Sequence, residues 1–396
     1  MSKKSYLAAV DKFFLDRPSG SARVAYDIAC LMRDRGYDVT VFCRRQKSQD
    51  PDQSEHEGIR VVRFDYPATA SLDPFKLYKQ IAAGSEAARK HLSGRKWDIV
   101  HLHLAPHGQM VINALGPEQK YLYTAHSPMV DEQLANWADQ GVSGKIKMLL
   151  GRNTLRKVEL GVLRQVRRIH TLSNYTRQML SQRYGLEDKY TVIPHWCRQD
   201  FFRTHSKTEA RQKLNWPEDA RIIFTVRRLA PRMGLDVAIE AIAPLLKQYP
   251  DVWFCLAGEG PLRQWLAERA ESLGVSDRIL FLGRISDQML KLCYEAADLF
   301  ILPTRALECF GLPVLEAMAF GLPLITTDAA AIPELMRPIL PDCIIPAGSI
   351  GALHNKISDY LEKKISLPDS AKLVEYVSSN FGMEKITEQI VTFLKS

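Results

Sequence analysis

Short runs of β-branched and aromatic residues alternate with amphipathic helical stretches along the first half of the chain. The helical stretches include residues 22–35 and 155–166. A strand followed by a helix, repeated several times, is typical of a parallel sheet with helices on both faces. The predicted strands of this half are residues 6–10, 39–43, 59–64, 99–102, 120–124, 168–172 and 190–193.

The same alternation restarts after a polar stretch, residues 194–208. A length of 396 residues also favours two domains, each with its own core. We therefore predict two doubly wound α/β domains, residues 1–196 and 197–375, and a C-terminal helix, 376–396, that packs back on the first domain. The predicted strands of the second domain are residues 222–226, 253–257, 279–282, 299–302, 324–326 and 343–345, and its helices are 236–247, 261–273, 286–297 and 312–320.

Composition narrows the class of protein. A hydrophobic fraction of 46% and a charged fraction of 25% are ordinary for a soluble globular chain. No apolar stretch has the length of a membrane span or a signal peptide, so we expect a cytoplasmic protein, with a peripheral position at the inner face of the membrane left open. The seven cysteines are scattered without a C-x-x-C pair, which predicts neither a disulfide framework nor a zinc site.

The positive charge is concentrated in the first half of the chain. Residues up to Arg198 include 31 Lys+Arg and 20 Asp+Glu, whereas the remainder has 22 and 25. Residues 144–168 carry eight basic side chains and one acid, Glu159, among apolar residues. This pattern fits either a surface that rests on anionic lipid or an ordinary helix with a solvated face. Nucleic-acid binding is not predicted, because interleaved aromatics and a recognition motif are missing.

Glu308 and Glu316 lie eight positions apart, on either side of a turn-prone Phe-Gly-Leu-Pro segment that leads into a predicted helix. Backbone N–H groups at the start of a helix suit an anionic phosphate. Surface acids in local ion pairs are the alternative, but the apolar neighbours of Glu316 favour a buried carboxylate that needs a partner such as a sugar diol. The segment therefore predicts a binding site.

In open parallel sheets, ligands bind beyond the carboxyl ends of the strands. We therefore expect the functional residues in the loops that follow predicted strands. Two domains of this kind leave a cleft between them if these loops face each other. The loops include residues 16–21, 125–128, 227–234, 258–261, 304–311 and 327–334, and Arg284.

A series of short motifs occupies these loops in order: P-S-G-S-A-R at residues 18–23, D-I-V-H-L-H at 98–103, T-A-H-S at 124–127, T-L-S-N-Y-T at 171–176, V-I-P at 192–194, R-R-L-A-P-R-M-G at 227–234, A-G-E-G-P at 257–261, F-L-G-R at 281–284 and I-P-E at 332–334. With the two glutamates they make the chain resemble the retaining glycosyltransferases of the GT-B architecture, family 4. The resemblance spans nearly the whole chain. It implies transfer of a sugar from a nucleotide-diphosphate donor with retention at the anomeric carbon, without a metal ion or other cofactor.

The resemblance also implies roles by position. The first domain would hold the acceptor and the second the nucleotide sugar. Glu316 would bind the ribose and Glu308 the donor sugar, while His126 would touch that sugar and the reacting centre. The catalytic residues implied are His126 and Glu308, and the donor-binding residues are Gly20, Arg228, Arg232, Arg284, Phe310, Gly311, Leu312 and Glu316.

Several positions depart from the family's pattern. The family commonly has G-R-L and then E-K-G, whereas this chain has Arg227 for the glycine and Met233 for the lysine. Either Arg227 or Arg232 would then supply the second cation for the diphosphate, since a guanidinium binds phosphate oxygens in pairs, or the leaving group would be less stabilised. A Gly-Gly pair usual before I-P-E is Ala330-Ala331 here, and the frequent I-P-N-G is I-P-H-W at residues 193–196.

Donor and acceptor are less defined than the fold. We expect a UDP-sugar rather than a GDP-sugar, and a glycan or lipid-linked acceptor in cell-surface or extracellular polysaccharide synthesis. The alternatives are a sugar-nucleotide epimerase of the same fold and a non-catalytic nucleotide-sugar binder. A dinucleotide-dependent oxidoreductase is disfavoured, because no G-x-G-x-x-G follows the first strand. We interpret His101 and His103 as packing residues, and Asp50-Pro51-Asp52 as a chance match to a metal motif.

Overall fold

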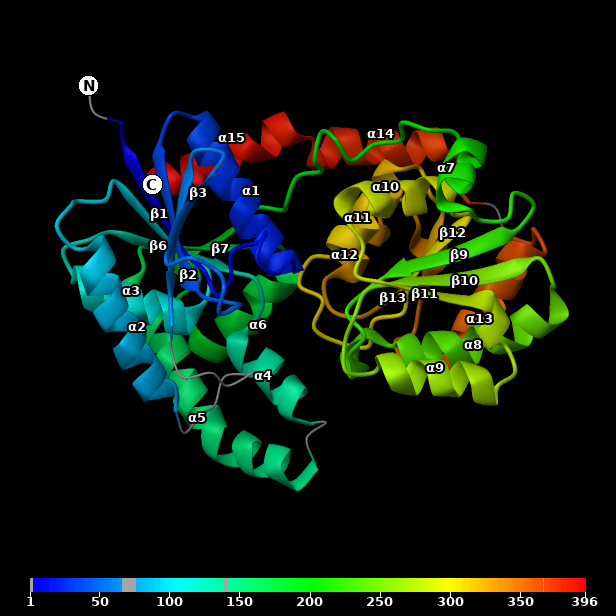
Figure 1. Ribbon diagram of the computed structural model, residues 1–396, viewed down its shortest axis with the longest axis horizontal. Coiled ribbons are helices and arrows are strands. Elements are labelled where there is room, and N and C mark those ends of the chain that lie inside the picture. The colour runs from blue at the N-terminus through cyan, green and yellow to red at the C-terminus, as the bar shows by residue number, and fades with distance from the viewer. Residues whose placement is uncertain (1–2, 66–75, 139–140, 366) are drawn as a thin grey trace. The chain divides into compact units, whose positions relative to one another are not determined.

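The computed structural model describes residues 3–65, 76–138, 141–365 and 367–396 (Figure 1). By its contacts the chain divides into two compact units, residues 1–195 with 386–396, and residues 196–385. The expected C-terminal segment 376–396 is shared between them, because α14 (Ser370–Phe381) lies in the second unit and most of α15 (Met383–Lys395) in the first.

The first unit is built on an eight-stranded sheet of order β3-β4-β2-β1-β5-β6-β7-β8. All neighbouring pairs are parallel except β3 with β4. β3 is not among the predicted strands, because its residues are polar and carry no hydrophobic signal. The strands are β1 (Ser5–Ala9), β2 (Asp38–Arg44), β3 (Gln53–His56), β4 (Ile59–Phe64), β5 (Ile99–Leu102), β6 (Tyr121–Ala125), β7 (Arg168–Thr171) and β8 (Tyr190–Val192).

Helices cover both faces of this sheet (Figure 1). α5 begins at Gly141, well before residue 155, where the hydrophobic periodicity places its start. Gly144, Gly151 and Asn153 weaken the helical signal there, although α5 as a whole packs against α4 and α3. The helices are α1 (Gly20–Asp34), α2 (Leu77–Leu92), α3 (Ala105–Leu115), α4 (Met129–Ala138), α5 (Gly141–Gln165) and α6 (Asn174–Tyr184).

The second unit has a six-stranded, all-parallel sheet of order β11-β10-β9-β12-β13-β14. Its strands are β9 (Arg221–Val226), β10 (Val252–Ala257), β11 (Ile279–Gly283), β12 (Leu299–Leu302), β13 (Leu324–Thr327) and β14 (Ile344–Ile345). Its helices of five or more residues are α7 (Lys207–Leu214), α8 (Leu235–Gln248), α9 (Arg263–Ser272), α10 (Asp287–Ala296), α11 (Leu312–Ala319), α12 (Ile332–Met336), α13 (Ile350–Leu361) and α14. The predicted class, two doubly wound α/β units, is confirmed.

Each sheet lies inside its unit, which explains why its strands read as continuous hydrophobic runs. β1, β5 and β6 are buried at every residue, and so are β12 and β13. Strands covered by helices on both faces have no solvent side that would select polar residues. The carboxyl ends of the strands therefore carry the polar chemistry of each unit.

Candidate functional site in the strand-end loops

The second unit brings two of the predicted loops together where its strand order reverses. β9 is followed along the chain by β10 and β11 on one side, while β12 lies on its other side, so the β9/β12 boundary is a topological switch point. The loop after β9 and the loop after β12 are joined by a backbone hydrogen bond from Arg305 N to Arg232 O of 2.9 Å. Gly234, with φ of 70°, ends the first loop at a point where a Cβ would lie 1.9 Å from Pro303 O.

Arg227 joins these two loops through its side chain. Its Nη1 donates to Glu308 Oε2 at 2.7 Å, and its Nη2 donates to Thr304 Oγ1 at 2.9 Å. The guanidinium also contacts the sulfur of Met233, the residue that stands in the lysine position. The side chains of Arg227 and Glu308 are only 6% and 17% exposed, so this ion pair is largely withdrawn from solvent. Of the two arginines left open for the second cation, Arg227 lies beside Glu308.

The N-terminus of α11 follows Glu308 directly. Gly311 is the N-cap residue, with φ of 101°, a left-handed conformation that favours glycine. In the described part of the chain, no group accepts a hydrogen bond from the backbone N–H of Phe310, Gly311 or Leu312. These three donors and the positive end of the helix dipole make the turn suited to an anion.

Glu316 lies one turn further along α11 and is half-buried. Its Oε2 accepts a hydrogen bond from the Tyr294 hydroxyl at 2.9 Å. Burial, with the Glu316 charge as the next cause, raises the pKa of Tyr294, so this phenol remains a donor. Tyr294 was not predicted from the sequence, because a tyrosine in the middle of an amphipathic helix reads as an ordinary core residue.

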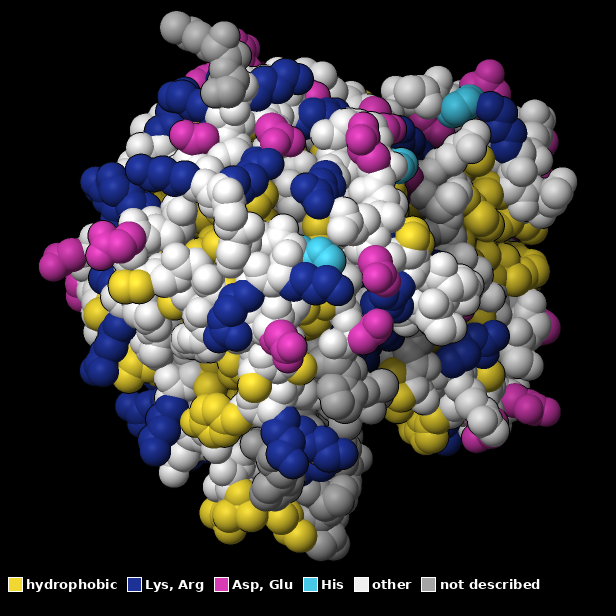
Figure 2. Space-filling model, turned by 60° about the vertical axis from the view of Figure 1, so that its left-hand side comes forward, with side chains coloured by type: hydrophobic (Ala, Val, Ile, Leu, Met, Phe, Trp, Pro, Cys, Tyr) yellow, Lys and Arg dark blue, Asp and Glu magenta, His cyan; other side chains and the backbone are white. Residues whose placement is uncertain are grey.

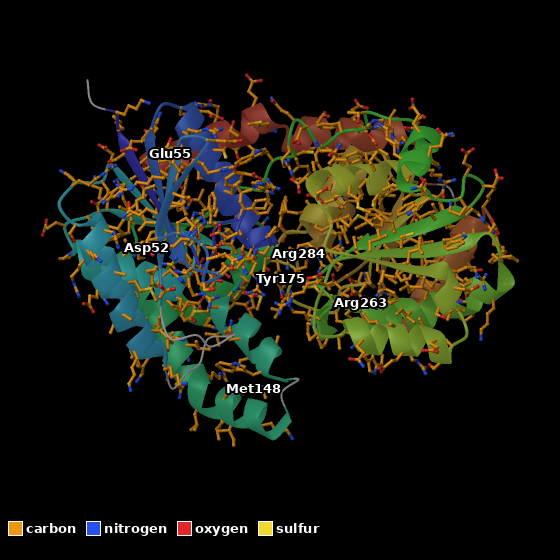
Figure 3. The ribbon with its side chains drawn as sticks, viewed as in Figure 1. Asp52, Glu55, Met148, Tyr175, Arg263 and Arg284 are labelled. Carbon is orange, nitrogen blue, oxygen red and sulfur yellow. The ribbon has the colours of Figure 1, made fainter. Side chains whose placement is uncertain are left out.

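The other predicted donor residues of this unit lie near the same strand ends. Arg228 is exposed, and Arg232 donates through Nη1 to Leu307 O at 2.9 Å. Arg284 follows β11 and is exposed, with Nη2 3.5 Å from Glu259 Oε2 (Figure 3). The exposed side chains of Arg228 and Arg284 can therefore reorient toward a ligand, whereas the Arg232 side chain is hydrogen-bonded to the backbone.

Two non-glycine residues of these loops have left-handed backbones. Leu307, just before Glu308, has φ of 59°, and Ala330 has φ of 56°. Ala330 occupies one of the two positions where the family usually has glycine. A glycine adopts this left-handed conformation without strain, whereas an alanine does not. Such conformations cost of order 1–2 kcal/mol each and concentrate at functional sites.

In the first unit, Gly20 is the first residue of α1 and is exposed. Ser19 caps the helix by accepting from Ala22 N at 3.3 Å. The loop before it is anchored to the sheet by Asp16, whose two oxygens accept from Arg63 Nε and Nη2 at 2.7 and 2.9 Å. This paired ion bridge, which the sequence analysis did not identify, fixes where the α1 N-terminus lies.

His126 follows β6, as predicted, and its Nε2 is 3.0 Å from His103 Nδ1. Burial lowers the pKa of His126 to about 3, so the ring is neutral at physiological pH. No described residue hydrogen-bonds to His126 Nδ1, which is buried. That nitrogen therefore has unused hydrogen-bonding capacity among the described residues.

Behind His126 lies a chain of buried hydrogen bonds whose donors can be assigned. His170 Nε2 lies 2.7 Å from Ile193 O, which only accepts, so His170 Nδ1 is unprotonated and accepts from Thr124 Oγ1 at 2.9 Å. Thr124 Oγ1 then accepts from His101 Nε2 at 2.7 Å, and Tyr6 donates to His101 Nδ1 at 2.8 Å. The interpretation of His101 and His103 as packing residues agrees with their burial.

Across the ranges that the structure describes, no group of three His, Cys, Asp or Glu side chains could hold a metal ion. Asp50-Pro51-Asp52 is used structurally. Arg45 pairs with Asp52, and Lys47 N donates to Asp50 Oδ2 at 2.8 Å. Asp52 directly precedes β3, and Glu55 lies on this strand (Figure 3). Within the described residues, no helix is both long and apolar enough to cross a bilayer.

Comparisons with known proteins identify the family. The profile "Glycosyl transferases group 1" matches residues 206–379, and "Glycosyl transferase 4-like domain" matches residues 19–196. The mannosylfructose-phosphate synthase of Agrobacterium fabrum is 25% identical over 327 residues, 77% of this chain and 70% of that protein. Other curated relatives are matched over less of their length, down to 35%.

Solved structures share the fold over the whole chain. The sucrose-phosphate synthase from Thermosynechococcus elongatus superposes with a TM-score of 0.83 at 22% identity, over 99% of this chain and 98% of that one. HepE of Anabaena, in complex with UDP and glucose, has a TM-score of 0.76 at 19% identity over 99% of this chain and 100% of that one. The chain therefore belongs to the group 1 glycosyltransferases and is a glycosyltransferase with the GT-B fold.

Proposed function

We propose that the protein transfers a sugar, with retention of anomeric configuration, from a nucleotide-diphosphate donor, preferably a UDP-sugar. The acceptor is a glycan or a lipid-linked saccharide in polysaccharide synthesis. The observation that carries the donor site is the ion pair of Arg227 and Glu308 beside the free N–H groups at the start of α11. A cation, a sugar-binding carboxylate and an anion-binding turn lie within one short segment.

In this proposal, charge from the protein replaces a divalent ion at the departing diphosphate. Arg227 and Arg228 neutralise the diphosphate oxygens, and the N–H groups of Phe310 to Leu312 add fixed dipoles. Glu308 exchanges its bond to Arg227 for hydroxyls of the donor sugar, and Glu316, oriented by Tyr294, accepts from the ribose. The departing phosphate assists the acceptor hydroxyl on the same face of the sugar, and His126 contacts the donor sugar.

UDP is preferred because the solved HepE structure of the same fold holds UDP and glucose. A thermal-shift series with UDP, GDP and ADP tests this preference, since a ligand that binds only the folded protein raises its melting temperature. We expect the largest rise with UDP. A larger rise with GDP would contradict the choice of base but not the site.

The site itself is tested by E308Q and E316Q. We expect each to reduce the release of UDP from a UDP-sugar by about two orders of magnitude or more, while E268Q on the exposed face of α9 changes little. Full activity in both site variants would refute the assignment. NMR of the product's anomeric configuration tests retention, and an inverted configuration would contradict it.

Two alternatives remain distinguishable by their products. An epimerase converts the donor into its epimer without an acceptor, whereas a transferase releases the nucleoside diphosphate. A non-catalytic binder shows the thermal shift without any turnover. The epimer, or binding alone, in otherwise intact protein would replace the proposed transfer.

We also propose that α5 contacts anionic membrane. Near its start, Ile146, Leu149 and Leu150, the apolar tip, are 50%, 78% and 54% exposed. They share one side of the helix at i, i+3 and i+4 spacing, with Lys145 and Arg152 nearby. Figure 2 shows hydrophobic side chains at the lower end of this face, with Lys and Arg side chains beside them.

Flotation with phosphatidylcholine vesicles, with and without phosphatidylglycerol, tests this contact. We expect L149S/L150S to lose binding to the anionic vesicles, whereas Ile350→Ser, which removes an exposed apolar side chain from α13, retains it. Absence of wild-type binding at low salt would refute membrane contact through 144–168.

A further inference from the structure

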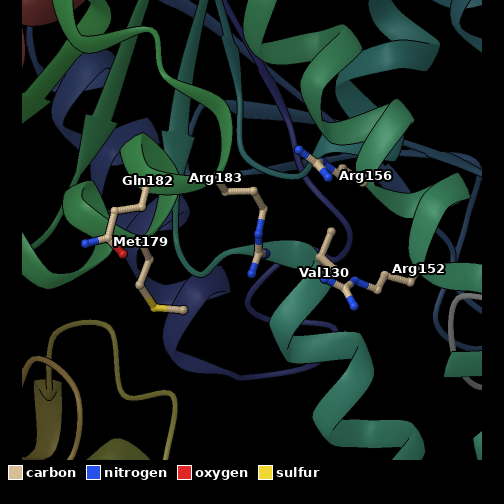
Figure 4. Close-up of a pocket in the computed structure, with 6 residues that line it drawn as sticks. All are labelled: Val130, Arg152, Arg156, Met179, Gln182 and Arg183. Atoms are coloured by element: carbon tan, nitrogen blue, oxygen red, sulfur yellow. The ribbon is translucent and has the colours of Figure 1, made fainter. Parts of the chain in front are cut away.

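A pocket lies within the first unit, between α4, α5 and α6, and has a volume of about 330 Å³. Figure 4 shows two arginines entering it from α5 and a third from α6. We call it the arginine pocket. Its lining residues are Val130, Arg152, Arg156, Met179, Gln182 and Arg183.

The three arginines differ in what they already bind. Arg183 is paired with Asp131 through both carboxylate oxygens, one of them at 2.7 Å. Arg152 and Arg156 are exposed, and no residue in the described part of the chain forms an ion pair or hydrogen bond with either. One carboxylate against three guanidiniums leaves the pocket with an excess of about two positive charges.

Two of these cations come from one side of α5. Arg152 and Arg156 are four residues apart on α5, so they lie one turn apart on the same side of the helix. Gln182 of α6 lines the opposite wall. A planar guanidinium binds two phosphate oxygens at once, and two guanidiniums together match the oxygens of a phosphate group.

The walls of the pocket are held rigid by Glu159, the single acid of the basic segment. It is 1% exposed; its Oε1 accepts from Met129 N at 2.8 Å and its Oε2 from the Tyr184 hydroxyl at 2.6 Å. One side chain of α5 therefore ties the first residue of α4 to the last residue of α6. Glu159 therefore fixes the three helices that line the pocket relative to one another, so that the backbone of the pocket is formed without a bound anion.

We propose that the arginine pocket binds a phosphate group carried by the acceptor. This inference rests on the proposed function and deepens it, because it names the chemical class of the acceptor: a phosphate ester. Val130 and Met179 provide apolar wall for the carbon next to the ester. Val130 is four residues after His126 along the chain, which places the pocket beside the loop that carries this histidine.

Isothermal titration of the full-length protein with inorganic phosphate, in the presence of UDP to occupy the donor site, tests the pocket. We expect R152Q/R156Q to weaken phosphate binding at least about tenfold, since each lost contact is a charge-assisted hydrogen bond. The control K157Q/R164Q removes two exposed charges from the same helix outside the pocket and should bind like wild type. Equal loss in both variants, or no phosphate binding by wild type, would overturn the inference.

A second measurement separates this inference from the proposed function. The thermal shift with UDP is recorded on the same proteins. If the wild-type protein responds to UDP but binds no phosphate, only the proposed phosphate pocket is refuted. If it binds phosphate through Arg152 and Arg156 but does not respond to UDP, the proposed donor site is refuted. R152Q/R156Q should keep the full UDP response, which also shows that it is folded.

The phosphate can belong to a soluble ester or to a lipid headgroup. Flotation with phosphatidylcholine vesicles containing phosphatidic acid, with and without inorganic phosphate, distinguishes them. Vesicle binding that depends on Arg152 and Arg156 and is released by phosphate supports the lipid source. Phosphate binding that weakens in R152Q/R156Q without any vesicle binding supports the soluble ester.

Discussion

Arg227 stands where the family commonly has glycine, and Met233 where it commonly has lysine. In the structure the Arg227 guanidinium contacts the Met233 sulfur and donates a hydrogen bond to Glu308. The two positions that depart from the family's pattern are therefore in direct contact with each other. We propose that they form one exchange, in which Arg227 supplies the cation that the lysine commonly provides.

This exchange predicts a rescue. R227G should weaken binding of a UDP-sugar by about ten- to a hundredfold, because it removes charge-assisted hydrogen bonds and leaves Glu308 without its partner. The double variant R227G/M233K, which restores the common family pair, should regain most of that affinity. Isothermal titration measures both. Affinity in R227G equal to wild type, or no recovery in the double variant, would assign the cation to another residue.

Ala330 offers a second prediction at this scale. Its φ of 56° is strained for alanine and free for glycine, so A330G should raise the free energy of unfolding by about 0.5–1 kcal/mol in urea titrations. A331G is the control, since Ala331 has φ of −82° and gains nothing from glycine. A331G should lower the free energy of unfolding by about 0.5–1 kcal/mol. Equal changes in the free energy of unfolding for A330G and A331G would show that the Ala330 backbone does not destabilise the protein.

Among the structural elements, the loops after β9 and β12 behave as one unit. Arg305 N donates to Arg232 O, Arg232 donates to Leu307 O, and Gly234 approaches Pro303 O too closely for a side chain. The geometry of Glu308 therefore depends on contacts in a loop more than 60 residues away along the chain.

G234A tests this coupling. Because its Cβ would overlap Pro303 O at 1.9 Å, we expect the loops to separate, with a loss of stability of about 3 kcal/mol or more and a clear loss of UDP affinity. G36A has a similar positive φ but nothing within 4 Å of the added Cβ. It should cost about 1–2 kcal/mol and leave UDP affinity unchanged. Matching affinities in the two variants would contradict the coupling.

For the molecule as a whole, the buried histidines set how stability depends on pH. Burial lowers the pKa of His107 and His170 to about 4 and of His126 to about 3, and those of His101 and His103 also fall well below the ordinary value. In the unfolded chain each histidine titrates near its ordinary pKa of about 6.5. The unfolded state therefore binds more protons between these values.

The stability is thus complete above pH of about 6.5 and is lost progressively as the pH falls from there toward 4, by on the order of 3 kcal/mol for His107 alone. Urea unfolding at a series of pH values measures this slope. Carboxylates with a lowered pKa, such as Asp11 and Asp251, also stabilise the folded protein. This stabilisation is lost only as the pH falls to and below the ordinary carboxylate pKa. A flat profile between pH 6.5 and 4.5 would contradict the burial of neutral histidines.

The sequence by itself determined the two α/β units, the order of nearly all strands along the chain, the loops in which Glu308 and His126 lie, and the helix that carries Glu316. It could do so because strands buried on both faces read as continuous apolar runs, and because loops that follow them carry turn residues and polar groups. The strand β3 and the start of α5 escaped prediction. β3 is polar and is stabilised by its hairpin with β4, while Gly144 and Gly151 weaken the helical signal at the start of α5.

Only the tertiary structure decided which cation lies beside Glu308, that Tyr294 orients Glu316, and that Arg152, Arg156 and Arg183 line one pocket. Periodicity reports which face of an element is buried, but it does not report which side chains of different elements meet. Those meetings depend on strand order, helix length and rotamers, which arise from packing over the whole unit. The chemistry of each site is therefore local in space although its residues are far apart in the chain.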